Sequence, residues 1–449
     1  MSIAVVILAA GKGTRMVSDL PKALHKVAHT PLLEHTMRAA AILAPEKTVV
    51  IVGYEGEKVA LEAQRINKEA FIAEQKEQLG TAHAVSMSKD ALSGFNGDIL
   101  VLYADTPFIS AETMEKITDA RAISDLVVLG FNAEDPARYG RLITNKGQLE
   151  RIVEFRDASE EERAITLCNS GVMAGPASLL LSLIEEVDNE NASGEYYLTD
   201  CVALAHAIGK TTKVVICDEK ETLGINSRQD LALAEAAFQD RARKEHMQNG
   251  VSLLAPETVF FSFDTVLGRD SVVEQNVVFG PKAAIESAVH IKAFCYIEGA
   301  HVSEGATVGP FARLRPGAEL GEQVRVGNFV EIKNAVIGDG AKINHLSYVG
   351  DAEVGASANI GAGSVTCNYD GVMKHRTTIA EGAFIGSNTM MVAPVNIGKD
   401  AMTASGSVIT KDIPEGALAL ARASQETKLG MARKLMDILK KRKQKKDLG

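Results

Sequence analysis

The hydrophobic positions of this chain change their period near its middle. Up to about residue 226, short runs rich in Val and Ile alternate with segments in which apolar residues recur every three or four positions. The first pattern is typical of buried parallel strands and the second of covering helices. Strands are predicted at 3–8, 49–52, 99–102, 126–129 and 214–216, and helices at 32–43 and 198–207. The alternation predicts a Rossmann-like α/β domain whose mostly parallel sheet is covered on both faces.

Residues 227–248 are rich in Ala, Glu, Arg and Gln and contain no Pro. This composition favours one continuous helix. Asn226 or Ser227 is expected to cap its start, and Gly250 follows its end. We interpret the segment as a linker, which divides the chain into a first domain at 1–226, a linker helix at 227–248 and a second domain at 249–449.

In the second domain, aliphatic residues recur every six positions, with a few steps of five, and glycine often follows them. The series consists of Val302, Val308, Leu314, Leu320, Val326, Ile332, Ile337, Ile343, Val349, Val354, Ile360, Ile379, Ile385, Met391, Ile397 and Ile409. A six-residue period predicts a left-handed parallel β-helix built from hexapeptide repeats, in which each side of a triangular coil buries one aliphatic side chain.

Residues 366–378 interrupt this repeat and are predicted to project as a loop. Insertions in solenoid proteins commonly build binding surfaces. Taken by itself, the segment favours the alternative of a tolerated surface insertion over a binding surface.

Composition narrows the function classes. The formal net charge of −10 argues against nucleic acid as the main partner. The basic tail at 440–446 is expected to be a solvated, frayed end, although a packed helix from Leu429 onward is an alternative. Five scattered cysteines without metal spacing suit reduced thiols, and no apolar run is long enough to insert into a membrane. We therefore expect a cytoplasmic protein.

The chemistry is expected to begin where strand 3–8 ends, at Ala9-Ala10-Gly11-Lys12-Gly13. Small residues let backbone N–H groups approach a ligand, Arg15 adds a positive charge, and a helix is expected shortly afterwards. The segment lacks the first glycine of a Walker A loop and the third glycine of a dinucleotide fingerprint. A nucleotide's phosphates and base remain suitable ligands.

Asp105 follows the strand at 99–102, at the edge of the sheet where ligands bind in such folds. It is a candidate metal ligand, and its alternative role is to cap a helix. Mg²⁺ accepts few protein oxygens beside phosphate oxygens, so one carboxylate and one amide would suffice.

The pattern Leu8-x-x-Gly11-x-Gly13-Thr14-Arg15-Met16, followed by Pro21-Lys22, resembles the signature of sugar-1-phosphate nucleotidylyltransferases. With the linker helix and the hexapeptide domain, the resemblance extends over nearly the whole chain to the bifunctional N-acetylglucosamine-1-phosphate uridylyltransferase and glucosamine-1-phosphate acetyltransferase family. This resemblance implies a homotrimer that makes UDP-N-acetylglucosamine from acetyl-coenzyme A (acetyl-CoA) and UTP with Mg²⁺. The product would feed peptidoglycan and lipopolysaccharide synthesis.

For the first domain, the resemblance implies four groups of residues. Leu8, Ala9, Ala10 and Gly11 would contact the nucleotide, with the catalytic cations Arg15 and Lys22 on its phosphates; Gln75, Gln78, Gly80 and Thr81 would read uracil; Tyr103, Gly140, Glu154 and Asn169, with Tyr197 and Thr199, would hold the sugar; Asp105 and Asn226 would bind Mg²⁺. Ala104 stands where the family has glycine, and its methyl group is expected to tighten the sugar pocket slightly.

Acetyl transfer to an amine needs a base, and imidazole titrates near neutrality. His345 lies in the repeat region, where a lone histidine is more often structural, but the resemblance implies that it is the general base. The implied sugar-phosphate residues are Arg315, Lys333, Tyr348 and Asn359, and the implied acetyl-CoA residues are Ala362, Asn368, Tyr369, Ser387, Ser405 and Arg422. Ser405 replaces an alanine that is frequent in the family.

Two other functions are compatible with parts of this pattern. One is a monofunctional sugar-1-phosphate nucleotidylyltransferase whose β-helix is structural or regulatory. The other is a non-catalytic assembly subunit, for which damage at Arg15, Lys22 or Asp105 would be expected, yet all three are present.

Overall fold

The computed structural model describes residues 2–447 and divides into two compact units. One unit extends to Glu245 and includes Phe261–Phe263, and the other consists of His246–Phe260 and the chain from Asp264 onward.

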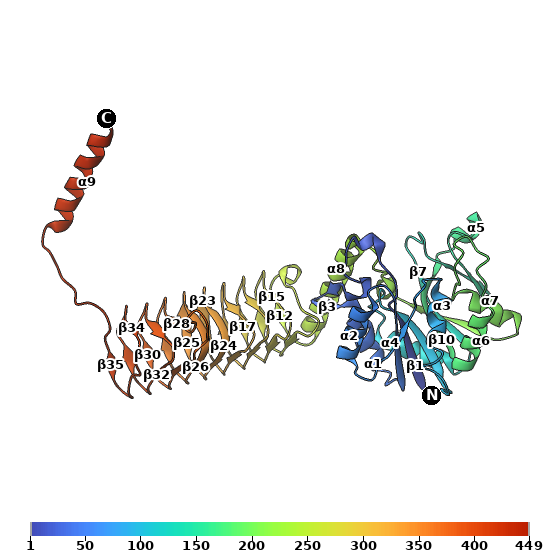
Figure 1. Ribbon diagram of the computed structural model, residues 1–449, viewed down its shortest axis with the longest axis horizontal. Coiled ribbons are helices and arrows are strands. Elements are labelled where there is room, and N and C mark those ends of the chain that lie inside the picture. The colour runs from blue at the N-terminus through green and yellow to red at the C-terminus, as the bar shows by residue number, and fades with distance from the viewer. Residues whose placement is uncertain (1, 448–449) are drawn as a thin grey trace. The chain divides into compact units, whose positions relative to one another are not determined.

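The first unit is built on a nine-stranded sheet with the order β11-β7-β10-β6-β1-β4-β5, to which β8 and β9 attach (Figure 1). Its main strands pair in parallel except β10, which runs antiparallel to both neighbours. The strands are β1 (Ile3–Leu8), β4 (Lys47–Val52), β5 (Phe71–Glu74), β6 (Asp98–Tyr103), β7 (Leu126–Asn132), β8 (Arg141–Asn145), β9 (Gln148–Val153), β10 (Leu167–Pro176) and β11 (Thr212–Cys217), with a separate pair β2 (Lys26–Val27) and β3 (Thr30–Pro31).

Both faces of this sheet are buried, as the continuous apolar strands predict. Val5 and Ile7 of β1 belong to one core cluster, and Ala4 and Val6 belong to the other. The helices that cover the sheet and surround it are α1 (Leu32–Ala41), α2 (Gly56–Ile66), α3 (Thr81–Ser86), α4 (Ala111–Arg121), α5 (Glu160–Arg163), α6 (Ala177–Glu185) and α7 (Asp200–Ala207). The predicted α/β architecture is confirmed.

The predicted linker helix is α8 (Arg228–Gln248). Ser227 caps it, because its Oγ accepts a hydrogen bond from Asp230 N at 3.2 Å while the Asp230 carboxylate accepts one from Ser227 N at 2.8 Å. This reciprocal pair is a capping box with Asp in the acidic position, and it decides between the two predicted cap residues.

In the second unit, short parallel strands stack as successive coils (Figure 1). Hydrogen bonds such as Glu304 N to Glu286 and Glu322 N to Asp339 join neighbouring coils across 18 and 17 positions. Eighteen residues correspond to three sides of six, and seventeen to a coil with one side of five. All the aliphatic positions of the predicted repeat are buried, none more than 4% exposed. The predicted parallel β-helix is therefore confirmed.

One sheet of the β-helix contains β12 (Ser252–Leu253), β14 (Val272–Val273), β17 (His290–Ile291), β20 (Thr307–Val308), β23 (Arg325–Asn328), β25 (Lys342–His345), β27 (Asn359–Ile360), β30 (Phe384–Ile385), β33 (Met402–Thr403) and β35 (Leu418–Ala419). The remaining strands are β13 (Val266–Leu267), β15 (Val278–Phe279), β16 (Ala284–Ile285), β18 (Tyr296–Ile297), β19 (Ala300–Val302), β21 (Arg313–Leu314), β22 (Ala318–Leu320), β24 (Glu331–Ile337), β26 (Tyr348–Val354), β28 (Val365–Cys367), β29 (Thr377–Ile379), β31 (Met390–Val392), β32 (Val395–Ile397) and β34 (Val408–Ile409).

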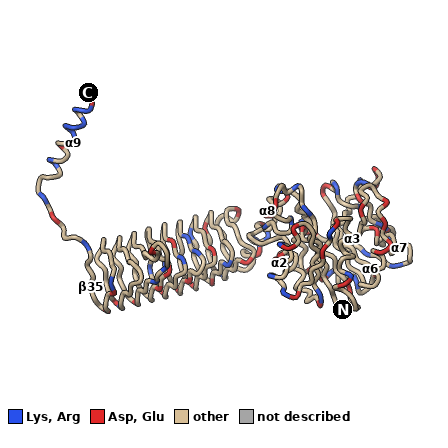
Figure 2. Tube along the Cα trace, in the orientation of Figure 1, with Lys and Arg blue, Asp and Glu red and all other residues tan. Residues whose placement is uncertain are grey.

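The insertion agrees with the sequence prediction, and the C-terminal segment does not. The insertion projects between β28 and β29 as predicted, with Val372 and Met373 exposed. The tail is not frayed: residues Met431–Asp447 form the helix α9, which is exposed along its whole length and rich in Lys and Arg (Figure 2). A run of Lys, Arg, Met and Leu has high helix propensity, so it stays helical although it is solvated.

Candidate active sites

The signature segment lies at the carboxyl end of β1, beside the ends of its two neighbours in the sheet. Ala9 N donates to Ile51 O at 2.9 Å, and Ala104 N donates to Leu8 O at 3.1 Å. A small hollow of about 50 Å³ opens here, lined by Leu8, Ala9, Gly11, Lys22, Ala23, Ala104 and Asp105. Ala104 is 2% exposed, packs in a core cluster and lines this hollow.

The α-helix expected after this segment does not form. Only a 3-10 turn, η1 (Thr14–Met16), follows, between Gly13 and Val17, which both have left-handed backbone conformations (φ +63° and +47°). Residues in this conformation end a helix. Position 13 also has no room for a side chain, because a Cβ added there would lie 2.8 Å from Lys22 Cβ. Arg15 is exposed in η1, and the described structure brings it into no ion pair with Asp105.

Lys22, in the turn η2 (Lys22–Leu24), joins the two predicted metal ligands. Its Nζ lies 2.5 Å from Asp105 Oδ2 and 2.7 Å from Asn226 Oδ1. Ile225 N donates to Asp105 O at 2.9 Å, which fixes Asn226 beside the end of β6. A carboxylate oxygen and an amide oxygen from distant segments thus face one cationic atom, a donor set that also suits a hard divalent ion.

The predicted uracil-reading residues form a connected group after β5. Gln75 is buried, and its Nε2 donates to Gly80 O at 3.0 Å, while Gln78 Nε2 donates to Ala10 O at 3.2 Å. Thr81 Oγ1 accepts from Leu198 N at 2.9 Å. These bonds hold the segment 75–81 against the signature loop and beside the start of α7.

The predicted sugar residues come together at the start of β10. A Cβ added to Gly140 would lie 3.4 Å from Glu154 Oε1 and 3.5 Å from Asn169 Cβ. Asn169 N donates to Gly140 O at 2.8 Å, and Thr199 Oγ1 donates to Glu154 Oε1 at 3.3 Å. Hollows of about 390 and 370 Å³ flank this group, and both are lined by Glu154 and Tyr197.

Burial dominates the electrostatics of this pocket. It raises the pKa of Glu154 above its usual value, and the neighbouring carboxylates of Asp200, Asp157 and Glu195 add to the shift against the Thr199 hydrogen bond. Burial likewise raises the pKa of the Tyr103 hydroxyl, followed by the charges of Asp105 and Glu154. Tyr103 therefore remains a neutral hydrogen-bond donor between the sugar residues and Asp105.

In the β-helix, His345 ends β25, and its imidazole contacts a side chain that the sequence did not predict. Its Nδ1 lies 2.8 Å from Asn328 Oδ1 on the preceding coil. Because an amide oxygen only accepts, Nδ1 carries the proton and Nε2 has the free lone pair. Asn328 precedes His345 by 17 residues, so their contact follows only from the register of the coils.

Three predicted acetyl-CoA residues continue this stack. Gly363 N donates to His345 O, Asn388 N to Ala362 O, and Gly406 N to Ser387 O, at 3.1, 2.7 and 2.8 Å. Ala362, Ser387 and Ser405 therefore follow His345 on consecutive coils. Arg422 is exposed just beyond the last coil, next to Ala421, and Asn359 pairs with Lys342 instead of His345.

Several charged side chains lie close together at the corner of the β-helix where β26 begins. Arg315 Nη1 lies 2.7 Å from Glu331 Oε1, and the pKa of Lys333 is lowered chiefly by the neighbouring Lys374, with smaller contributions from desolvation and then from Arg315. Lys374 belongs to the insertion and was missed as a site residue. Such a group of cations suits a phosphate.

The insertion is fixed to this corner by Asp351. The Asp351 carboxylate accepts hydrogen bonds from Asn334 Nδ2 at 2.6 Å and from Asn368 Nδ2, and Asn368 Nδ2 lies 3.5 Å from the Tyr348 hydroxyl. Tyr369, the next residue, is 61% exposed. The loop thus holds one acetyl-CoA candidate and presents the other to solvent.

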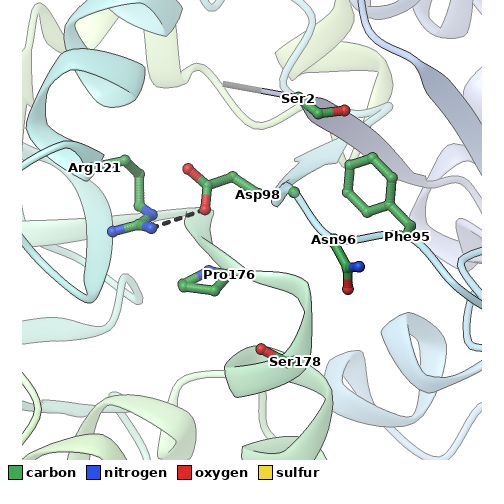
Figure 3. A pocket seen from close by; sticks show the side chains of 8 residues that line it. Ser2, Phe95, Asn96, Asp98, Arg121, Pro176 and Ser178 are labelled. Carbon is green, nitrogen blue, oxygen red and sulfur yellow. Dashed lines mark hydrogen bonds and ion pairs between the residues drawn. The ribbon is translucent and has the colours of Figure 1, made fainter.

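Another hollow, of about 380 Å³, lies at the opposite edge of the α/β sheet, where β1 and β6 begin (Figure 3). Its lining includes Ser2, Phe95, Asp98, Arg121 and Ser178. Arg121 already pairs with Asp98 at 2.8 Å, and none of the predicted site residues lines the hollow. It is separate from the candidate sites.

No helix within residues 2–447 is long and apolar enough to cross a membrane. All five cysteines are free, and Cys168, Cys201 and Cys295 are buried.

Comparison with known proteins agrees with both halves of the chain. Residues 5–186 match the model of the MobA-like NTP transferase domain. The chain is 62% identical to the bifunctional protein GlmU of Ruegeria sp. (strain TM1040) and 59% identical to that of Roseobacter denitrificans (strain ATCC 33942 / OCh 114), each over 100% of both sequences. It is 58% identical to GlmU of Cereibacter sphaeroides (strain ATCC 17025 / ATH 2.4.3), covering 98% of this chain and 97% of that one. The chain therefore belongs to the GlmU family of bifunctional proteins.

Proposed function

We propose that this chain makes UDP-N-acetylglucosamine in two reactions. The β-helix transfers an acetyl group from acetyl-CoA to glucosamine-1-phosphate, and the α/β unit then transfers uridylyl from UTP to the product and releases pyrophosphate. The observation that carries the proposal is that one chain assembles the polar groups of both reactions: Lys22 between Asp105 and Asn226, and His345 on Asn328. The product is a precursor for peptidoglycan and lipopolysaccharide.

Nucleotidyl transfer needs alignment and charge neutralisation more than covalent chemistry. The Lys22 ammonium is suited to pair with a phosphate oxygen of UTP, and Arg15, exposed in η1, is free to approach the remaining phosphates. Glu154 and Asn169 orient the sugar, so that its phosphate oxygen faces the α-phosphate. Tyr103 stays neutral, because burial raises the pKa of its hydroxyl.

We infer that Mg²⁺ is the metal cofactor and that Asp105 and Asn226 hold it, since their oxygens converge on one point. When bound, the ion would neutralise charge on the phosphates. Lys22 would then exchange these partners for phosphate oxygens.

For acetyl transfer, the amine nitrogen attacks the thioester carbonyl, a C–N bond forms, the C–S bond breaks and coenzyme A leaves as a thiolate, which becomes the thiol when the His345 imidazolium passes the amine's proton to the sulfur. His345 Nε2 takes the proton that the amine loses, because Nδ1–H is held by Asn328. Arg315, Lys333 and Lys374 are suited to bind the sugar phosphate. Ala362, Ser387 and Ser405 would line the thioester's path along the stack.

We also propose that the chain is a homotrimer. Phe294, Phe311 and Phe329 occupy the same corner on three consecutive coils, and their rings stack with centroids 4.8 and 5.2 Å apart. They are 48%, 45% and 54% exposed, and Leu346, which follows His345, has the same left-handed backbone conformation. An exposed apolar ladder of this kind suits burial against another copy, since only a β-helix of equal pitch repeats at the same spacing.

The experiment is a two-stage assay on the purified full chain. Glucosamine-1-phosphate and acetyl-CoA are mixed first, and free thiol is followed; UTP and Mg²⁺ are then added, and pyrophosphate is followed. Signal in both stages is expected. Pyrophosphate without any thiol release, when N-acetylglucosamine-1-phosphate is supplied, would favour the monofunctional alternative with a structural β-helix.

A further inference from the structure

Arg141, the first residue of β8, is an arginine buried in an unusual way. It is 1% exposed, and its guanidinium donates to the carbonyl oxygens of Ala137, Tyr139 and Arg163. A buried guanidinium is costly to desolvate, and here the compensation comes from peptide carbonyls. The buried guanidinium of Arg141 thus fixes the backbone between Ala137 and Gly140.

The bond to Tyr139 O has a directional consequence. The Tyr139 carbonyl and the Gly140 N–H belong to one peptide group, and because that peptide is trans they point in opposite directions. With its oxygen fixed on Arg141 Nη1, the peptide must direct the Gly140 N–H away from the guanidinium. The peptide that follows is fixed as well, because Gly140 O accepts from Asn169 N at 2.8 Å.

The backbone N–H of Gly140 has no acceptor within the described protein. Gly140 is buried, lies beside Glu154 and Asn169, and within residues 2–447 its N–H donates to no protein acceptor. Buried backbone donors are nearly always satisfied, so an exception in a pocket indicates a ligand or water acceptor. The cation on the carbonyl also polarises the peptide and strengthens its N–H as a donor.

We propose that Arg141 is a positioning residue of the uridylyltransferase site, which touches no substrate but aims the Gly140 N–H at an acceptor oxygen of the sugar. The inference rests on the proposed function and deepens it. Arg141 also lies over the Phe155 ring, 5.7 Å from its centroid, and Phe155 directly follows Glu154. One side chain therefore supports two neighbouring parts of the sugar pocket.

The structure offers a matched control. Arg163 lies over the same Phe155 ring at 4.7 Å, and its Nε donates to Phe155 O at 3.3 Å, but its side chain does not contact the Tyr139–Gly140 peptide. Arg163→Met removes a stacked arginine without releasing that peptide. Arg141→Met removes the same chemistry and releases it.

The test measures pyrophosphate release at varied concentrations of each substrate for the full chain. Arg141→Met is expected to raise KM for N-acetylglucosamine-1-phosphate about 10-fold, the value of one hydrogen bond, while KM for UTP changes less than about twofold. Arg141→Lys, whose ammonium can still bond to Tyr139 O, should recover part of the loss and covers the case in which the Met variant fails to fold. Arg163→Met should resemble the wild type.

The outcomes separate the two proposals. A wild-type chain that releases no pyrophosphate overturns the proposed function and this inference with it. An active wild type whose Arg141 variants raise both KM values equally, or match Arg163→Met, overturns the inference alone. Thiol release by the β-helix of the same variants reports on the integrity of the other unit.

Discussion

At the scale of single residues, the proposed acetyl transfer depends most on the contact between His345 and Asn328. An imidazole can accept a proton only at the nitrogen that lacks one, and Asn328 Oδ1 determines which nitrogen that is. A partner that sits one coil below and is itself part of a β-strand cannot easily move away. Asn328 therefore fixes the orientation of the His345 imidazole as well as its tautomer, as the proposed role of a base requires.

Two substitutions test this assignment. Asn328→Leu should lower the acetyltransferase kcat by about 10-fold, because the imidazole loses its orientation. Asn328→Asp keeps the acceptor but adds a negative charge that favours imidazolium, so the acid limb of the pH–rate profile should move to higher pH by about 1 unit. Profiles that coincide for wild type and Asn328→Asp would show that His345 does not act through this contact.

A second residue-scale prediction concerns stability. Asp200 begins α7, and burial, followed by the charges of Asp188 and Asp157, raises its pKa to about 6. This value lies above the roughly 3.9 of an unfolded aspartate, so the folded chain binds the proton more tightly. Stability is therefore lost as pH rises through this window, and above it the ionised carboxylate destabilises the fold.

Asp200→Asn removes the ionisation and should raise the melting temperature of the α/β unit at pH 7.5 while leaving it nearly unchanged at pH 4. Because the side chain is only half-buried, solvent screening reduces the expected gain to about 1 kcal/mol, or roughly 2 °C. Asp437→Asn on the exposed helix α9 serves as the control. Equal shifts at both pH values would contradict the assigned cause.

At the scale of elements, the periodicity of apolar residues was sufficient to predict the β-helix, because each six-residue repeat buries one side chain. The predicted aliphatic positions are buried, and at the two skipped positions Thr366 and Thr403 are buried in their place. The repeat also begins earlier than the sequence series, since Leu267, Val273, Phe279, Ile285, Ile291 and Ile297 are buried at the same spacing. The α/β strands were predictable for the same reason, because both faces are apolar.

Contacts between distant elements were not predictable from the pattern. The expected helix after Gly13 failed because Val17 adopts a left-handed conformation that few β-branched residues tolerate, which no local signal announces. Asp105 was correctly placed at a strand end, yet its contact with Lys22 depends on tertiary folding. The contacts of Asn328, Arg141 and Lys374 were not predicted for the same reason: each residue meets its neighbour only in the folded chain.

At the scale of the whole molecule, the phenylalanine ladder raises the question of assembly. Phe294, Phe311 and Phe329 all have φ between +56° and +62°, a region that costs a phenylalanine more than it costs Gly or Asn. A monomer gains little from three such residues that are also exposed. Stacking of the rings on each other covers part of their apolar surface. Packing against a second β-helix would bury the part that is still exposed.

Phe311→Asp, in the middle of the ladder, tests this argument without straining the monomer, since Asp tolerates the left-handed conformation better than Phe. It would place like charges in the apolar interface, so sedimentation should show three chain masses for wild type and one for the variant. Acetyl transfer should fall with it, because Leu346 and His345 adjoin the ladder, whereas uridylyl transfer should persist.

Phe71→Asp, at a phenylalanine of nearly equal exposure (46%) on the α/β sheet, is the matched control and should remain trimeric. A wild-type monomer, or a Phe311→Asp trimer with full acetyltransferase activity, would mean that the ladder is stabilised within one chain and that the site around His345 is complete without a neighbour.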